Sequence, residues 1–179
     1  MDVESVKGAP NLGQHQIGFR HADALTTADN HAVFKTMAKE IAAEHGKAIT
    51  FMARYDEGEG NSCHIQLSLR GADEAAAFSK NQGRTKVFDS FVAGLLATLY
   101  DFTLLYAPNI NSYKRFAAGS PAPTTIAWGL DDRCAVRLAG QGPTARLVNR
   151  VPGGDVNPYL ALAAMIAGGL YGLDHDLEL

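Results

Sequence analysis

Residues 146–160, RLVNRVPGGDVNPYL, contain a strand, a tight turn and the start of a helix in one short segment. Residues 146–151 are typical of a strand, and the Pro152-Gly153-Gly154 turn marks its end. Asn157 then favours a helix start, because asparagine caps helix N-termini and Pro158 suits the first helical position. The segment therefore predicts a strand that leads directly into the C-terminal helix.

The chain before this segment mixes strands and helices. Strands are predicted at residues 16–20, 48–53, 64–70, 126–128 and 135–139. A glycine-rich turn separates the second and third of these, which predicts a hairpin. One helix is predicted by the stripe of Val33, Met37 and Ile41 between capping residues at 26–29 and Gly46, and another by apolar residues in 88–99. Strand pairs interspersed with helices, without a βαβ rhythm, favour a single α+β domain over residues 1–179.

Charge and composition restrict the function. The net charge of −3 shows no basic excess, so binding to nucleic acid or to an anionic membrane is not expected. Residues 156–173 carry no charge but are rich in Ala and Gly and flanked by Asp155 and Asp174, which favours a buried soluble helix over a membrane span. No signal peptide is recognised, and Cys63 and Cys134 lack a metal-binding spacing. A cytoplasmic protein is expected.

Several segments are similar to glutamine synthetases. Residues 108–115, PNINSYKR, match the Asn-Ser-Tyr-Lys-Arg signature of that family, and residues 146–160 match the strand and final helix of its active-site barrel. Residues 60–69, GNSCHIQLSL, resemble its nucleotide- and metal-binding hairpin. Residues 13–17 and 24–30 also fit. The chain is thus identified as a member of the family along practically its whole length, most similar to the branch that includes γ-glutamyl-polyamine synthetases.

The resemblance implies a fold, a reaction and partners. The fold would be a portion of the catalytic domain, in which antiparallel strands form a partial barrel flanked by helices, without the β-grasp N-terminal domain. The family joins glutamate to an amine with ATP and Mg²⁺ or Mn²⁺. Its members form double rings partly through the N-terminal domain, so we expect a smaller homo-oligomer, a dimer, or a heteromer with a complementary subunit. The expected small-molecule ligand is an amino acid, an amine or an acyl anion.

The site that the resemblance implies contains several arginines. Guanidinium groups bind phosphates and carboxylates through two parallel hydrogen bonds, so these arginines are interpreted as anion-binding residues. The predicted substrate- and anion-binding residues are Gly60, His64, Arg115, Arg133, Arg137, Arg146 and Arg150. The catalytic candidates among them are His64, Arg115 and Arg150. Cys63 is not expected to form a catalytic pair with His64, since neighbouring residues of a strand point to opposite faces.

The family's metal ligands are replaced in this sequence. The resemblance places glutamates at positions that hold Ala9, Gln16 and Val148, and a second histidine at Gln66, while the metal-binding His64 is retained. One histidine cannot hold a hard divalent cation, which needs several oxygen ligands. We therefore expect no metal site, and the family's cofactors, ATP and Mg²⁺ or Mn²⁺, are not predicted for this chain. The remaining nearby carboxylates are interpreted as solvated turn residues: Glu57, Glu59, Asp131 and Asp132.

Three functions are compatible with this pattern, and whether the chain is an enzyme stays open between them. The first is a degenerate relative that keeps an arginine-lined pocket but has lost autonomous glutamate–amine ligase activity. The second is an enzyme redirected to metal-free acyl or amine transfer with His64 and the arginines. The third is a γ-glutamyl–amine ligase completed by a partner subunit.

Overall fold

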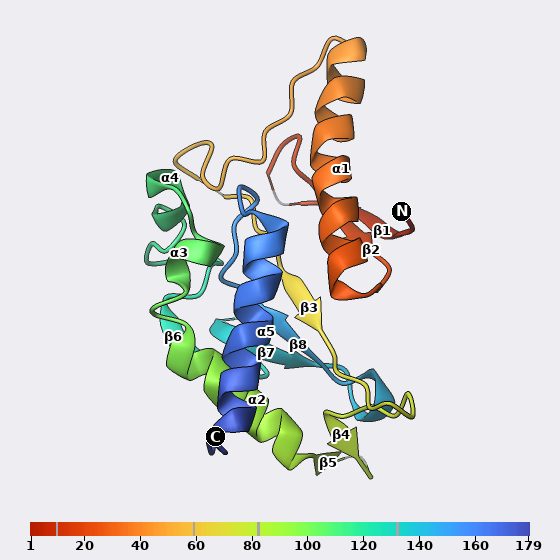
Figure 1. The fold of residues 1–179 in the computed structure, drawn as a ribbon. Coiled ribbons are helices and arrows are strands. Elements are labelled where there is room, and N and C mark those ends of the chain that lie inside the picture. The colour runs from red at the N-terminus through yellow and green to blue at the C-terminus, as the bar shows by residue number, and fades with distance from the viewer. Residues whose placement is uncertain (10, 59, 82, 132) are drawn as a thin grey trace. The chain divides into compact units, whose positions relative to one another are not determined.

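The computed structural model describes residues 1–9, 11–58, 60–81, 83–131 and 133–179 (Figure 1). Residue contacts divide the chain into two compact units, Met1–Phe51 and Met52–Leu179. Each unit is described by itself below, and the single domain over residues 1–179 stays a prediction.

The first unit contains a strand pair and one long helix. Strands β1 (Val3–Gly8) and β2 (His15–Phe19) pair antiparallel, which confirms the strand predicted at 16–20. Helix α1 (Ala24–Glu44) begins earlier than predicted, because Asp23 is its N-cap and accepts a 2.9 Å hydrogen bond from the Thr26 amide. The helix ends as predicted before Gly46, whose φ of 65° suits a residue without a side chain.

The second unit is built on a four-stranded sheet with the order β3-β8-β7-β6. Its strands are β3 (Ile65–Leu67), β6 (Thr125–Gly129), β7 (Cys134–Ala139) and β8 (Arg146–Asn149). β8 pairs antiparallel with both β3 and β7, in line with the antiparallel strands expected from the resemblance. The pairing of β6 with β7 departs from the all-antiparallel expectation, because these two strands run parallel. The sheet is open and does not close into a barrel. Where a partial barrel was expected, the structure has a small mixed sheet with helices covering one face.

The predicted hairpin of residues 48–53 with 64–70 is wrong. No strand forms at 48–53, where an isolated bridge joins Arg54 to Gly60 instead. The partner of β3 is β8, from far along the chain. The physical reason is that the backbone groups at residues 52–54 are bonded elsewhere: the Asn111 side-chain amide exchanges two hydrogen bonds with the Arg54 backbone, each 2.8 Å long.

Two long helices cover one face of this sheet (Figure 1). α2 (Lys86–Thr98) starts at the Thr85 cap, and α5 (Pro158–Asp174) starts at the predicted Asn157 cap, whose side chain accepts from the amides of Tyr159 and Leu160. The core between helices and sheet includes Phe88, Phe91, Val136, Leu147 and Met165, each at most 1% exposed. Within the described residues, no helix combines the length and apolar character needed to cross a membrane.

Glycines allow α2 and α5 to approach closely. A Cβ on Gly94 of α2 would lie 2.2 Å from the Gly168 carbonyl oxygen and 2.4 Å from the Gly172 amide nitrogen, both in α5. Contacts this short do not occur between real atoms, so only glycine fits. The Ala- and Gly-rich composition of residues 156–173 therefore serves helix–helix packing in a protein core.

Shorter elements connect these layers. They are the β4–β5 hairpin (Ser79–Lys80 and Gly83–Arg84), α3 (Thr103–Tyr106), α4 (Ile110–Tyr113) and the 3-10 helix η1 (Gly142–Thr144). Phe78, directly before this hairpin, is buried in the core. Helix α4 lies within the signature segment at residues 108–115.

Candidate functional site

Sheet register brings several of the predicted site residues onto one face of the second unit. Val148 of β8 lies directly opposite Gln66 of β3 and Arg137 of β7, and Arg137 lies opposite Gly129 of β6. Residues opposite each other in a sheet share a face, so these four form one row across it. The other face carries Val136 and Leu147 into the core. The row thus lies on the face that α2 and α5 leave uncovered.

Arg146 and Arg150 fall on the same face of the sheet, two residues on either side of Val148. The Arg146 guanidinium donates to the Gln66 side-chain oxygen and, at 3.4 Å, to the Thr144 carbonyl. Arg150 is 7% exposed, and its guanidinium donates to the Pro121 carbonyl at 3.3 Å. Arg137 is half-buried between them in the adjacent strand. This concentration of guanidinium groups is suited to an anion.

Arg115 is the most deeply buried charged residue of the described chain, at 2% exposed. Its guanidinium donates at 2.9 Å to the Val151 carbonyl and at 2.9 Å to the Ser62 hydroxyl. Burial lowers the pKa of Arg115, and the nearby Asp155 carboxylate opposes that shift. Arg115 therefore joins the segment after β8 to the segment before β3. Its role as an anion-binding or catalytic residue stays a prediction.

The signature segment around Arg115 is held by a polar network. The Asp155 carboxylate accepts from the Ser112 hydroxyl at 2.6 Å and from the Asn109 side-chain amide at 2.9 Å. The Asn109 backbone amide in turn donates to the Ser112 hydroxyl at 3.0 Å. Ser112 is completely buried, so its hydroxyl must find partners within the protein. Asn109 and Ser112 thus fix the short helix α4, which directly precedes Arg115.

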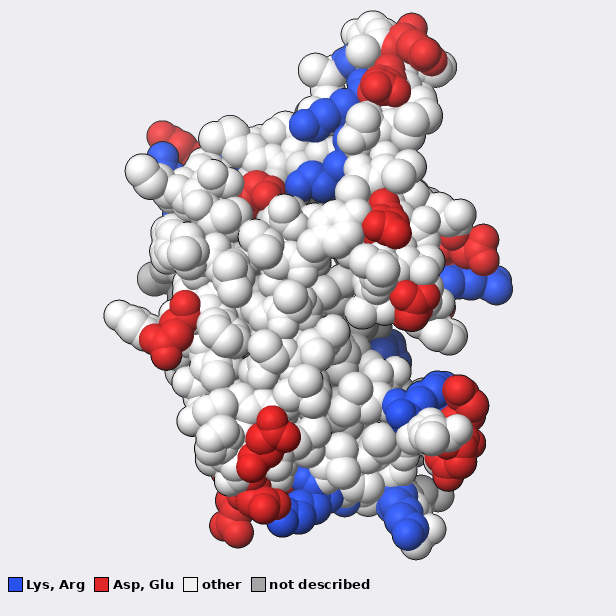
Figure 2. Space-filling model, viewed as in Figure 1, with Lys and Arg blue, Asp and Glu red and all other residues white. Residues whose placement is uncertain are grey.

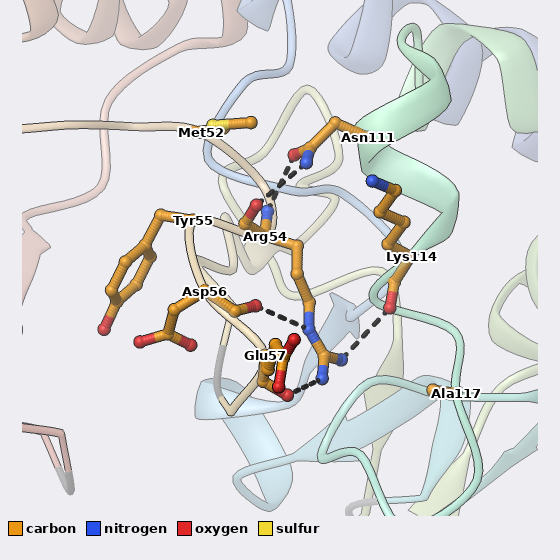
Figure 3. A pocket seen from close by; sticks show the side chains of 8 residues that line it. All are labelled: Met52, Arg54, Tyr55, Asp56, Glu57, Asn111, Lys114 and Ala117. Carbon is orange, nitrogen blue, oxygen red and sulfur yellow. Dashed lines mark hydrogen bonds between the residues drawn. The ribbon is translucent and has the colours of Figure 1, made fainter.

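Sequence reasoning missed Arg54, which clamps the loop leading to Gly60 (Figure 3). Its guanidinium donates to the carbonyls of Asp56, at 3.2 Å, and Glu57 within the loop, and to the Lys114 carbonyl at 3.1 Å. Its backbone is bound by Asn111, as described above. A lone arginine in a predicted turn carries no sequence signal for such a clamp, because its partners are backbone carbonyls.

A cavity of about 580 Å³ lies beside the Arg54 clamp. Figure 3 shows its lining, in which the Arg54 guanidinium turns towards the Lys114 carbonyl. The lining residues are Met52, Arg54, Tyr55, Asp56, Glu57, Asn111, Lys114 and Ala117. At the end of the loop, a Cβ on Gly60 would lie 2.4 Å from the Ala53 carbonyl oxygen and 3.0 Å from Arg115 Cγ. Gly60 thus allows the loop backbone to contact Arg115, and its substrate-binding role stays a prediction.

The remaining predicted residues lie at the surface. Arg133 forms an ion pair with Asp131 at 3.0 Å, in which the two side chains are 91% and 51% exposed. This pairing lowers the pKa of Asp131, chiefly through hydrogen bonds from Arg133. His64 is exposed, whereas Cys63 packs against the core, as expected for opposite faces of a strand. Anion binding by Arg133 and catalysis by His64 stay predictions.

The described residues of this sheet face do not fit a divalent cation. The position of an expected glutamate is occupied by Val148, which is 2% exposed and lies between an amide, Gln66, and a cation, Arg137. In the first unit, Gln16 lies opposite Lys7, and Ala9 follows β1. Among described residues, no group of three or more His, Cys, Asp or Glu side chains is placed to hold a metal. Glu59 and Asp132 lie outside the described residues.

The molecular surface shows no large field of one sign on the face drawn in Figure 2. Lys and Arg side chains lie there interspersed with Asp and Glu among the described residues. This distribution agrees with the net charge of −3.

Comparison with known proteins gives a consistent result over the whole chain. The family model described as glutamine synthetase, catalytic domain, matches residues 1–179. A gamma-glutamylethanolamide synthetase of Streptomyces coelicolor is 57% identical over an alignment of 180 residues, which covers 100% of this chain and 39% of that protein. A glutamate–isopropylamine ligase of a Pseudomonas species is 39% identical over 182 residues, which cover 98% of this chain and 40% of that protein.

Solved structures agree with these matches. A structure described as apo GmaS without ligand has a TM-score of 0.88 and 34% identity, and covers 99% of this chain and 42% of the other. A GmaS/ADP complex has a TM-score of 0.90 and 33% identity, covering 99% and 43%. The chain thus spans about two fifths of the length of these relatives.

Proposed function

Because the chain belongs to the glutamine synthetase catalytic-domain family, we propose that it is an arginine-lined anion- and amino-acid-binding member without autonomous metal-dependent ligase activity. The observation that carries this proposal is the row formed by Gln66, Val148 and Arg137. This row contains the guanidinium group of Arg137. Val148 stands where the resemblance implies a glutamate, and Gln66 stands where it implies a histidine. Such a surface attracts an anion and repels a divalent cation.

The chemistry expected of these residues is binding and orientation. Arg137 and Arg146 offer several N–H donors to a phosphate or carboxylate, and Arg150 adds charge beside them. In the family reaction, ATP and two divalent cations supply the phosphoryl group and its charge neutralisation. No step through those groups is assigned to this chain, since the described residues lack the oxygen ligands that such cations require.

The proposal is tested by turnover and by binding. Purified chain is incubated with ATP, glutamate and a panel of amines that includes ethanolamine, isopropylamine and a diamine, with and without Mg²⁺ or Mn²⁺. We expect no metal-dependent ADP release. Calorimetry with inorganic pyrophosphate should detect binding that Arg137→Ala weakens and that replacement of exposed Arg20 by alanine leaves unchanged. Metal-dependent ADP release would refute the proposal, and so would a pyrophosphate affinity that Arg137→Ala leaves unchanged.

A second candidate is a γ-glutamyl–amine ligase whose remaining active-site residues come from elsewhere. Two observations favour it: the relatives named as amide synthetase and amine ligase, and the 39–43% of their length that this chain spans. On this reading, ligase activity should appear only when the unmatched region of such a relative is supplied. Mass spectrometry of the γ-glutamyl amide would identify the product. The hypothesis of metal-free transfer through His64 stays a prediction.

A further inference from the structure

The cavity beside the Arg54 clamp is lined by charged side chains of both signs. We propose that it is a second binding site, for a small elongated zwitterion such as an ω-amino acid, in which an aliphatic chain separates the ammonium group from the carboxylate. The lining contains none of the residues of the uncovered sheet face, so this inference goes beyond the proposed function.

The charges of the lining balance each other. Arg54 and Lys114 are its cations, and Asp56 and Glu57 are its carboxylates. A ligand with a single charge is attracted by one of these pairs and repelled by the other, because the Coulomb interaction changes sign with the partner. A ligand that carries one charge of each sign interacts favourably with both pairs. The lining therefore selects a zwitterion.

The opposite charges of the lining are spatially separated. Among the described residues, neither the Lys114 ammonium nor the Glu57 carboxylate forms an ion pair or a hydrogen bond. Figure 3 shows the Lys114 side chain on one side of Arg54 and the Asp56 carboxylate on the other. A ligand that binds both kinds of group must therefore carry its two charges at different ends.

The walls of the cavity are fixed by the protein's own hydrogen bonds. The Arg54 guanidinium binds three backbone carbonyls, and the Asn111 side chain binds the Arg54 backbone. The Asp56 carboxylate accepts a 2.8 Å hydrogen bond from the Gly58 amide, which orients it. A site that is formed in advance loses less conformational entropy when a ligand binds.

Volume and apolar surface suit a small organic molecule. The cavity measures about 580 Å³, which falls within the range of ~300–1,000 Å³ typical of small-molecule sites. Met52, Tyr55 and Ala117 contribute apolar atoms to the lining. These side chains offer contacts to an aliphatic chain, while the charged side chains bind the two ends of the ligand.

A bound zwitterion would connect two segments of the second unit. The two carboxylates lie in the loop that leads to Gly60, and Lys114 belongs to the signature segment. A ligand that bridges them stabilises the loop against opening. Hydrogen exchange should therefore slow at the amides of Arg54 and Asn61, which donate to the Asn111 side chain and to the Ala53 carbonyl.

A set of probes with six carbon atoms tests the charge requirement. 6-Aminohexanoate carries its two charges at opposite ends, hexylamine and hexanoate carry one each, and norleucine, an isomer of 6-aminohexanoate, carries both at one end. Each probe is titrated into the full chain and followed by NMR. We expect millimolar affinity for 6-aminohexanoate, at least about threefold higher than for each of the other probes, which is the factor expected of one exposed ion pair.

Two substitutions test where the probe binds. Lys114→Ala and Glu57→Gln remove the charges but keep the backbone carbonyls that bind Arg54. Each should weaken binding of 6-aminohexanoate at least about threefold. Both should also abolish the slowing of hydrogen exchange by the probe. The matched control is Lys80→Ala, at an exposed position of β4, which should leave the affinity unchanged.

Several results would overturn the proposal. These are an absence of binding, equal binding of a probe with one charge or of norleucine, and an affinity that both substitutions leave unchanged. Inorganic pyrophosphate, the probe of the sheet face, should not displace 6-aminohexanoate, and displacement would show that the two share one site. Pyrophosphate binding by itself tests the proposed function, so the two proposals can fail independently.

Discussion

At the scale of single residues, Arg115 and Arg133 show how differently two arginines of this chain are placed. Arg115 is buried and bound to protein groups, whereas Arg133 lies in an exposed turn with Asp131. Identical side chains thus have different energetic roles, because a buried guanidinium leaves unsatisfied acceptors when it is removed and an exposed one does not.

Replacing Arg115 with methionine should lower the free energy of unfolding by roughly 2–4 kcal/mol, because the Val151 carbonyl and Ser62 hydroxyl lose a charged donor. Urea unfolding of the full chain measures the change. Arg133→Met, the exposed control, should leave the urea midpoint of unfolding unchanged. Equal effects of the two substitutions would contradict a bracing role for Arg115.

His31 predicts a pH dependence. Burial, and then the charge of Lys35, lowers the pKa of His31 below its ordinary value of about 6.5. The folded state therefore disfavours the proton, so the contribution of His31 to stability is complete above about pH 6.5 and is lost as pH falls through the folded pKa.

Urea midpoints at pH 7.5 and pH 5.5 should differ more for the wild type than for His31→Phe, which cannot titrate. Exposed His21 supplies the control: His21→Gln should keep the wild-type difference between the two pH values. If His31→Phe shows the same pH dependence as the wild type, the effect belongs to other groups.

At the scale of elements, side chains far apart in the sequence determine the path of loops and the packing of helices. The loop from Arg54 to Gly60 is clamped to the signature segment, and α2 packs on α5 through glycines. The clamp depends on hydrogen bonds of about 3 Å between side chains and backbone groups, and the helix packing depends on close contacts between backbone atoms, so both tolerate little change.

Asn111→Ala should loosen the loop, because it removes both hydrogen bonds to the Arg54 backbone. Hydrogen–deuterium exchange should become faster at the amides of Arg54 and Asn61, the latter of which donates to the Ala53 carbonyl at 2.9 Å. Lys114 takes part through its backbone carbonyl, so Lys114→Ala is the matched control and should not alter exchange there. Unchanged exchange in Asn111→Ala would exclude the clamp.

Gly94→Ala should destabilise the α2–α5 contact by roughly 1–3 kcal/mol, since overpacking against backbone atoms outweighs the better helix propensity of alanine. The clashing atoms are the Gly168 carbonyl oxygen and the Gly172 amide nitrogen. Gly83 has only an ordinary contact of 3.6 Å to the Lys80 carbonyl oxygen, so Gly83→Ala is the control. Thermal unfolding compares the two, and a more stable Gly94→Ala would show that the helices can separate without cost.

At the scale of the whole molecule, the open sheet of the second unit leaves two edges. β3 and β6 are its terminal strands, each paired on one side among the described residues. Edge strands present N–H and C=O groups to which another chain can bind. The dimer expected from the sequence is compatible with this arrangement and stays a prediction.

Size-exclusion chromatography with light scattering should give twice the 19.1 kDa of one chain. A charge on an edge strand opposes pairing, so Ile126→Lys, at an exposed position of β6, should shift the mass towards the monomer. A monomeric wild type would refute the dimer.

Local patterns in the sequence predicted much of the second unit. The caps at Asn157 and Pro158, the apolar spacing of α2 and the strands β6, β7 and β8 were all recognisable, because each signal lies within a few neighbouring residues. The signature at 108–115 and the segment at 146–160 indicated the family, which the comparisons confirm. Ala9, Gln16 and Val148, at which the resemblance implies glutamates, were also recognised in the sequence, and their interpretation as lost metal ligands stays a prediction.

Only the tertiary structure decided which distant segments meet. The partner of β3, the Arg54 clamp and the burial of Arg115 all depend on hydrogen bonds across more than thirty intervening residues. Backbone carbonyls supply several of those acceptors. Every residue type has a backbone carbonyl, so no sequence pattern predicts which carbonyl accepts a particular hydrogen bond. Conversely, the stripe of Val33, Met37 and Ile41 correctly predicted a helix, and the structure shows that these side chains are exposed. Periodicity shows that a side of a helix is apolar, but only three-dimensional packing decides what covers it.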